Sequence, residues 1–229
     1  MLPSHLYVHV PFCARRCIYC DFSIAVRNVV PVSDYLDGIR RELKGLVSSV
    51  SDIDEDTWRL DTLYLGGGTP SKLGGDGVRA LVDVLSDFAY LAPGAEVTIE
   101  ANPEDVTPKA LEAWAEAGIN RLSLGAQSFH DPVLTWMHRT HDRRQIGEAV
   151  RLTRAAGIDN ISLDLIFALP AGIERGWSDD LDAALGLEPQ HVSLYGLTIE
   201  AATPLQRWTD QQRISPATED RYAEEFLLA

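Results

Sequence analysis

The sequence predicts an α/β protein whose parallel strands curve into a complete or partial barrel. Six short runs rich in Val, Ile and Leu recur along the 229 residues, and segments with apolar residues at helical spacing separate them. Nearly continuous apolar runs are typical of parallel strands that are covered on both faces. Glycine clusters or polar residues follow almost every predicted strand, which favours a barrel over an open sheet with one ligand site.

The predicted elements alternate along the chain. The strands are expected at residues 5–10, 62–65, 96–101, 120–124, 161–167 and 191–196. The helices between them are expected at residues 35–50, 78–85 (after a glycine-rich turn at 74–77), 108–117, 144–156 and 177–185. Gly118 and Gly157 follow the third and fourth helices at the usual helix stop position. The acidic stretch 48–61 is expected to be an exposed connection, and residues 217–229 an amphipathic helix without a stop signal.

The charge balance disfavours several classes of partner. The chain has 34 acidic and 20 basic residues, a formal net charge of −14. Such a surface repels phosphate backbones and anionic lipid heads, so no nucleic acid or membrane partner is expected. No apolar run approaches the roughly 20 residues that span a bilayer, and no secretory signal precedes the first predicted strand. A cytoplasmic protein is therefore expected.

All three cysteines lie within eight residues, directly after the first predicted strand. Cys13, Cys17 and Cys20 form a C-x3-C-x2-C loop. An odd number of crowded thiols does not form a disulfide framework, so a metal site is expected. Zinc normally takes four ligands, and His9 could be the fourth, although it lies within the predicted strand, where the pleat fixes its direction. A 4Fe–4S cube held by three thiolates instead keeps one iron open for an outside ligand, which makes the cluster the favoured alternative.

A second unusual segment follows the second predicted strand. Residues 66–70 read Gly-Gly-Gly-Thr-Pro, and glycines at a strand end allow the backbone to approach a ligand closely. The plain alternative is a tight turn before a helix. A P-loop is excluded because no Gly-Lys-Ser/Thr sequence follows.

Together the cysteine loop and the glycine segment resemble the radical SAM superfamily. The resemblance implies a partial (β/α)6 barrel of the TIM type and a 4Fe–4S cluster on Cys13, Cys17 and Cys20. It further implies that the open iron binds S-adenosylmethionine, which is split to a 5′-deoxyadenosyl radical. Gly67, Gly68 and Thr69 match the segment that binds the methionine end of this cofactor.

Further segments resemble one family within this superfamily. They are residues 8–13, 19–22, 100–103, 127–129, 139–141 and 164–166. They are similar to the oxygen-independent coproporphyrinogen III oxidases and, within that family, to the HemW branch of haem chaperones. The oxidases carry a further cysteine two residues after the third, where this chain has Phe22, as in the HemW branch.

The resemblance also assigns site residues by position. Tyr7 would contact the cofactor near the cluster, and Glu100 would accept hydrogen bonds from it. A second cofactor or substrate site would be lined by Tyr19, Gln127, Arg139, Asp164 and Thr198. From the residues alone, Glu100 or Asp164 could instead form a buried ion pair with an Arg, and Arg139 could be an exposed loop residue. His138 and His141 lie in a charged loop and are expected to be solvated rather than haem ligands.

The expected function is a haem chaperone with haem as cargo, haem-requiring client proteins as partners and a separate electron donor. The alternative is oxidative decarboxylation of coproporphyrinogen III, and the third possibility is a zinc-stabilised barrel with unrelated small-molecule chemistry. Residues 1–200 would form the barrel. Residues 201–229 would begin a C-terminal extension, with the family's C-terminal domain lacking.

Overall fold

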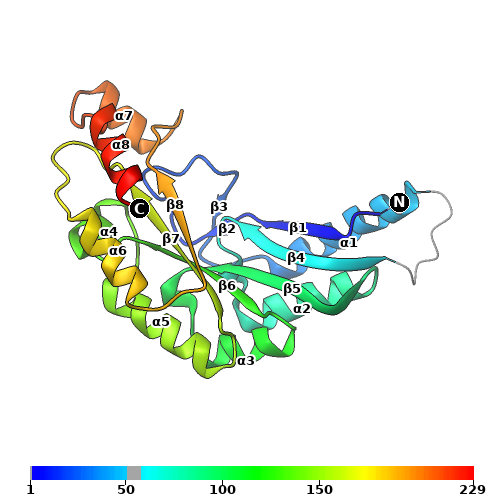
Figure 1. The fold of residues 1–229 in the computed structure, drawn as a ribbon. Coiled ribbons are helices and arrows are strands. Elements are labelled where there is room, and N and C mark those ends of the chain that lie inside the picture. The colour runs from blue at the N-terminus through cyan, green and yellow to red at the C-terminus, as the bar shows by residue number, and fades with distance from the viewer. Residues whose placement is uncertain (1, 51–57) are drawn as a thin grey trace.

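The computed structural model, which describes residues 2–50 and 58–229, confirms an α/β fold around one curved parallel sheet (Figure 1). Its strands follow one another in chain order: β1 His5–Val10, β4 Arg59–Gly67, β5 Tyr90–Ala101, β6 Arg121–Gln127, β7 Asn160–Phe167 and β8 His191–Gly196. Every neighbouring pair is parallel. Strands β1 and β8 form the two edges, so in the described part of the chain the sheet is an open arc, a partial barrel.

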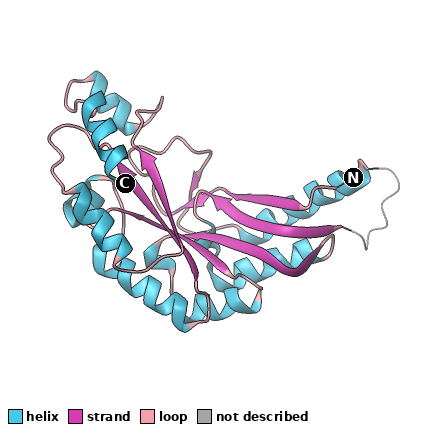
Figure 2. Ribbon diagram, viewed as in Figure 1, coloured by secondary structure: helices cyan, strands magenta, loops and turns pink. Residues whose placement is uncertain are grey.

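Helices cover the outer, convex face of this arc (Figure 2). They are α1 Val32–Ser48, α2 Gly74–Ser86, α3 Pro108–Glu116, α5 Arg143–Ala155 and α6 Trp177–Leu185. The core lies between helices and sheet: Leu65, Ile99, Leu122 and Leu163 of four neighbouring strands are fully buried, together with Trp114 of α3. The five helices predicted between the strands are thereby confirmed, and so is the final helix, α8 Glu219–Leu228.

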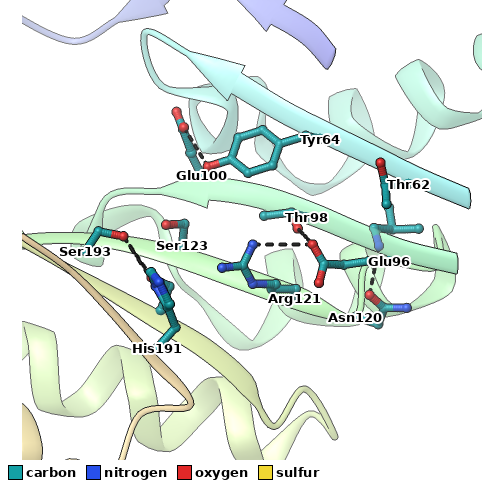
Figure 3. A network of polar contacts seen from close by, with 12 residues as sticks. Thr62, Tyr64, Glu96, Thr98, Glu100, Asn120, Arg121, Ser123, His191 and Ser193 are labelled. Atoms are coloured by element: carbon teal, nitrogen blue, oxygen red, sulfur yellow. Dashed lines mark hydrogen bonds and ion pairs between the residues drawn. The ribbon is translucent and has the colours of Figure 1, made fainter. Parts of the chain in front are cut away.

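The inner, concave face of the sheet is polar, which the apolar runs did not predict. Strand β5 alternates Glu96, Thr98 and Glu100 on this face with the buried Val97 and Ile99 on the other. Figure 3 shows polar side chains from neighbouring strands facing one another across it. Because the helices named above cover the convex face, the concave face can carry the polar groups of a site.

Several boundaries differ from the prediction. Helix α2 begins at Gly74 rather than after Gly77, because Gly74 (φ +71°) turns the chain directly from the short 3-10 helix Pro70–Leu73 into α2. Strands β4 and β5 begin earlier than expected. The short helices α4 Asp131–Trp136 and α7 Pro204–Asp210 were not predicted.

The acidic stretch expected to be an exposed connection is only partly described. Residues 51–57 lie outside the described residues, whereas Ser48 ends α1 and residues 59–61 belong to β4. Trp58 is buried, and its indole N–H donates to the Pro3 carbonyl at 2.7 Å. Among the helices that the structure describes, none is both long and apolar enough to cross a membrane.

Candidate functional site

A cavity of about 390 Å³ lies where the carboxyl ends of the strands meet the cysteine loop. Parallel strands end on the same side of a sheet, so residues far apart in the sequence converge here. All but one of the predicted site residues line it: Cys13, Cys17, Tyr19, Cys20, Gly67, Gly68, Thr69, Glu100, Gln127, Arg139, Asp164 and Thr198. The exception is Tyr7, which is half exposed on β1, with its hydroxyl 3.3 Å from His9 Nδ1.

The cysteine loop is closed at its base by two very short strands. β2 Phe12–Cys13 pairs with β3 Ala25–Val26, and the Ala25 N–H donates to the Pro11 carbonyl at 2.7 Å. This pairing holds the ends of the loop together, so the three thiols face the cavity. Burial raises the pKa of the Cys13 and Cys20 thiols. Metal binding deprotonates such groups.

The glycine segment packs tightly against this loop. A Cβ on Gly68 would lie 2.9 Å from the Pro11 backbone and 3.0 Å from Cys13 Sγ, and Gly67 has φ +118°. The Thr69 hydroxyl is 3.4 Å from the same sulfur. Glycine is therefore required here so that the segment can pack against the cysteine loop, and this packing places the Gly67 and Gly68 backbone at the cavity.

Glu100 is the carboxylate nearest to this segment. It accepts hydrogen bonds from the Tyr64 hydroxyl at 2.9 Å, drawn in Figure 3, and from the Gly67 N–H at 3.0 Å. Burial raises the pKa of Glu100, although these two donors stabilise its ionised form. A partly buried carboxylate of this kind favours a cationic ligand.

Asp164 lies on β7 across the cavity. Both of its carboxylate oxygens are 3.1 Å from the Ser123 hydroxyl, and burial raises its pKa. Among the described residues, neither Glu100 nor Asp164 lies within ion-pair distance of a Lys or Arg. The expected alternative of a buried pair with arginine is therefore not what the structure has.

Arg139 reaches into the site and is not an exposed loop residue. Its guanidinium donates to Asn102 Oδ1 at 2.5 Å, to the Gly125 carbonyl at 3.0 Å and to Cys17 Sγ at 3.5 Å. It thus links the cysteine loop to the ends of β5 and β6. Asn102 also lines the cavity, although it was not among the predicted site residues.

The prediction for His141 was wrong. Its side chain is buried, with Nε2 3.1 Å from the Ala126 carbonyl and Nδ1 3.3 Å from Glu104 Oε2. Burial alone would raise the pKa of Glu104, but the imidazole of His141 and the hydroxyl of Thr140 outweigh it and lower the pKa to about 2. The contact fixes the loop that carries Arg139. His138 is exposed, as expected.

The remaining predicted residues line the cavity from three different segments of the chain. Tyr19 packs on a small apolar cluster of Val133, Met137, Ile166 and Leu169. The Thr198 hydroxyl donates to Glu200 at 2.8 Å. Gln127 ends β6 with a left-handed backbone, φ +67°. Tyr64 and Ser123 were missed, although a polar residue within an apolar strand was the available signal.

The three thiols suit a cluster better than a single ion. Within residues 2–50 and 58–229, no three His, Cys, Asp or Glu side chains gather closely enough to hold one metal ion. A zinc site normally takes four ligands, whereas a 4Fe–4S cube held by three thiolates keeps one iron open for an outside ligand. His9, the candidate fourth zinc ligand, has Nε2 2.9 Å from the Ser23 carbonyl and Nδ1 3.3 Å from the Tyr7 hydroxyl, so both nitrogens have partners.

Comparison with known proteins agrees with this geometry. The model of the radical SAM superfamily matches residues 7–176. Curated relatives named heme chaperone HemW include proteins from Synechocystis sp. (34% identical, 98% of this chain and 54% of the relative), Mycobacterium tuberculosis (36%, 99% and 57%) and Escherichia coli (36%, 88% and 52%). The chain therefore spans about half the length of the curated relatives it matches.

Solved structures show the same fold. The coproporphyrinogen III oxidase HemN from Escherichia coli, described as a radical SAM enzyme, has a TM-score of 0.83 at 24% identity, over 98% of this chain and 50% of that one. The hydrogenase maturase HydG has a TM-score of 0.62 at 19% identity, over 96% and 47%. These likenesses show that the curved parallel sheet with its outer helices is a shared fold.

Proposed function

This chain belongs to the radical SAM superfamily, and we propose that its cavity binds a 4Fe–4S cluster and S-adenosylmethionine as part of a haem chaperone. The observation that carries the proposal is the joint placement of three thiols, a glycine segment and two carboxylates around one cavity. Each element has the chemistry that one part of this cofactor pair requires.

Cys13, Cys17 and Cys20 would hold the cluster through three of its irons. When bound and reduced, the cluster supplies the electron that cleaves the sulfonium of S-adenosylmethionine. Thr69 and Arg139 direct a hydroxyl and a guanidinium at Cys13 and Cys17, and such hydrogen bonds to sulfur tune cluster potentials. The chain thus contributes both ligation and electrostatic control.

The glycine segment and the carboxylates would bind S-adenosylmethionine. The backbone of Gly67 and Gly68 allows close approach beside Cys13. Glu100, held by Tyr64, and Asp164, held by Ser123, offer negative charge to a cationic cofactor and acceptors to its hydroxyl or amino groups. Tyr19, Gln127, Arg139 and Thr198 would complete the lining of the cavity, and Tyr7 would act through its contacts with Tyr64 and His9.

The chaperone role rests on the HemW relatives and on Phe22. This side chain is 60% exposed and lines the cavity at the position where the oxidases have a further cysteine. Haem would be the cargo, with haem-requiring client proteins and an electron donor as partners in the cytoplasm. Residues 1–200 would form the barrel and residues 201–229 the start of a further part.

The first test is anaerobic reconstitution followed by iron and sulfide analysis and EPR of the reduced protein. We expect about four irons and four sulfides per chain, and an EPR signal that changes when S-adenosylmethionine is added. Glu100→Gln is expected to retain the cluster and to reduce the change in the EPR signal that S-adenosylmethionine causes. Glu96→Gln is the matched control, because Glu96 lies on the same face of β5 outside the cavity (Figure 3). An EPR signal that does not change when S-adenosylmethionine is added would contradict the proposal.

A second experiment separates the chaperone from the oxidase. The reconstituted protein is titrated with haem and, separately, incubated with coproporphyrinogen III, S-adenosylmethionine and a reductant. Stoichiometric haem binding without release of carbon dioxide supports the chaperone. Turnover to a vinyl product with carbon dioxide supports oxidative decarboxylation.

A further inference from the structure

Two neighbouring strands end in residues with unusual backbone conformations. Gln127, the last residue of β6, has φ +67°, and Ala168, directly after β7, has φ +56°. Left-handed backbone is uncommon for residues other than glycine and persists only where surrounding contacts hold it. Strained backbone conformations are concentrated at functional sites. The contacts that hold these two turns therefore help to set the shape of the cavity.

One buried ionic cluster contacts both turns. On the β6 side, Asp180 of α6 accepts hydrogen bonds from the Ser128 hydroxyl at 2.8 Å and the Phe129 N–H at 2.6 Å. On the β7 side, Glu225 of α8 accepts from the Ala168 N–H at 2.7 Å. The residues that directly follow Gln127 and Phe167 are therefore each fixed by a carboxylate.

Arg175 joins the two carboxylates. Its guanidinium lies 2.6 Å from Asp180 Oδ2 and 3.4 Å from Glu225 Oε2, and its side chain is fully buried. It also lies over the Trp177 ring, 4.6 Å from the centroid. Removing one partner of such a buried cluster leaves another charge buried without a counter-charge. The three side chains therefore hold one another in a single arrangement.

Helix α8 is attached to the site at a second point. Tyr222 packs directly against Gly196, which lines the cavity at the end of β8, so closely that a Cβ on Gly196 would collide with the Tyr222 ring. The same ring lies 4.9 Å from that of Phe167. Figure 1 shows α8 beside the ends of β7 and β8.

We propose that Arg175, Asp180 and Glu225 are positioning residues that hold the left-handed turns after β6 and β7, and thereby set Gln127 in the cavity. No residue of helix α8 lines the cavity. The helix nevertheless influences the site, because its Glu225 holds the turn after β7. This inference rests on the proposed function, because S-adenosylmethionine is the probe that reads the position of Gln127.

The test begins with Glu225→Gln in the anaerobically reconstituted chain. The amide keeps the shape of the side chain but removes the charge that faces Arg175 and Arg221, whose Nε lies 2.8 Å from Glu225 Oε1. We expect about tenfold weaker binding of S-adenosylmethionine, equal to roughly 1.4 kcal/mol, with unchanged iron and sulfide content. Glu224→Gln is the matched control, because it makes the same charge change at an exposed position of the same helix, and it should bind as the parent does.

A double-mutant cycle distinguishes positioning from general destabilisation. Gln127→Ala is expected to weaken binding about tenfold by itself, and adding Glu225→Gln to it should change the affinity less than twofold. The inference would be overturned if the two losses of affinity multiplied in the double variant, or if either single variant bound S-adenosylmethionine as the parent does. A parent chain that does not bind S-adenosylmethionine would instead contradict the proposed function.

A second variant covers the case in which Glu225→Gln folds poorly. Arg175→Lys keeps the positive charge but lacks the fork that reaches both carboxylates. Amide hydrogen exchange of residues 126–131 should rise in Arg175→Lys and in Glu225→Gln, although Glu225 contacts only the other turn. If exchange rose only around Ala168, Arg175 would not couple Glu225 to the turn after β6, and the inference would be overturned.

Discussion

The cysteine loop and the strand-end carboxylates form two sides of one cavity and are built in different ways. The loop contributes three thiols from eight consecutive residues. The opposite side, formed by Glu100, Gln127 and Asp164, draws its residues from three strands, each more than 25 positions from the next. The first is a local motif, whereas the second exists only when the sheet is assembled.

Because of this difference, the two sides of the cavity should respond differently to substitution. The loop depends on ligand chemistry at single positions, so one substitution removes its function. The carboxylate side depends on supporting contacts, such as Tyr64 with Glu100 and Ser123 with Asp164, so its function should decline by degrees. The following substitutions test the contrast in order of decreasing effect.

The largest effect is expected from Cys17→Ser, which removes a cluster ligand without changing the size of the loop. Because two thiolates hold a cube poorly, bound iron and acid-labile sulfide should be almost completely lost after reconstitution. The exposed Ala14→Ser in the same loop is the control and should reconstitute fully. Full cluster content in Cys17→Ser would show that the ligand assignment is wrong.

Gly68→Val should affect both sides of the cavity at once. Its Cβ would meet the Pro11 backbone at 2.9 Å and Cys13 Sγ at 3.0 Å, so the glycine segment and the loop must move apart. We expect S-adenosylmethionine affinity to fall by more than about tenfold, with reduced cluster content. The control is Gly45→Ala in α1, where a Cβ meets nothing within 4 Å. Parent-like affinity in Gly68→Val would contradict the close approach.

Glu104→Gln tests the contact that fixes the Arg139 loop. The pKa of Glu104 falls from 4.5 to about 2, so the folded state favours the ionised carboxylate. Its stabilisation is present above pH 4.5 and is lost as the pH falls toward 2. Glu104→Gln should therefore lower the free energy of unfolding by about 2–3 kcal/mol at pH 7 and by much less at pH 3, measured by urea denaturation.

The matched control for this pH dependence is Glu148→Gln, which breaks an exposed pair with Arg151 on α5. Exposed pairs contribute little, so its unfolding free energy should match the parent at both pH values. An equal loss in Glu104→Gln at pH 7 and pH 3 would mean that His141 and Thr140 do not act on the ionised carboxylate.

The smallest effect is expected from Tyr64→Phe, which leaves Glu100 in place. Losing the hydroxyl removes a donor to the ionised carboxylate, so the already raised pKa of Glu100 rises further. S-adenosylmethionine affinity should fall about two- to fivefold near neutral pH, and the pH below which binding weakens should move upward. The exposed Tyr90→Phe at the start of β5 is the control. A pH profile identical to the parent's would argue against this support.

The same contrast explains what could be predicted from the sequence. The strands, the main helices and the cysteine loop follow from short patterns, because apolar periodicity and ligand spacing are local. Helix α4 was missed because its six residues are too short for a periodic signal. His141 was placed in solvent because its neighbours are charged, whereas its burial depends on Glu104 and Ala126, which come from other elements.

The open edges of the sheet have a mechanical consequence. A closed ring of strands has a diameter fixed by its strand number and stagger, but an arc whose outermost members, β1 and β8, are not bonded to each other has no such constraint. Its curvature is instead set by how tightly the outer helices pack on its back. Enlarging a buried side chain such as Ala149 of α5 should therefore flatten the arc and widen the mouth without altering any residue that faces it.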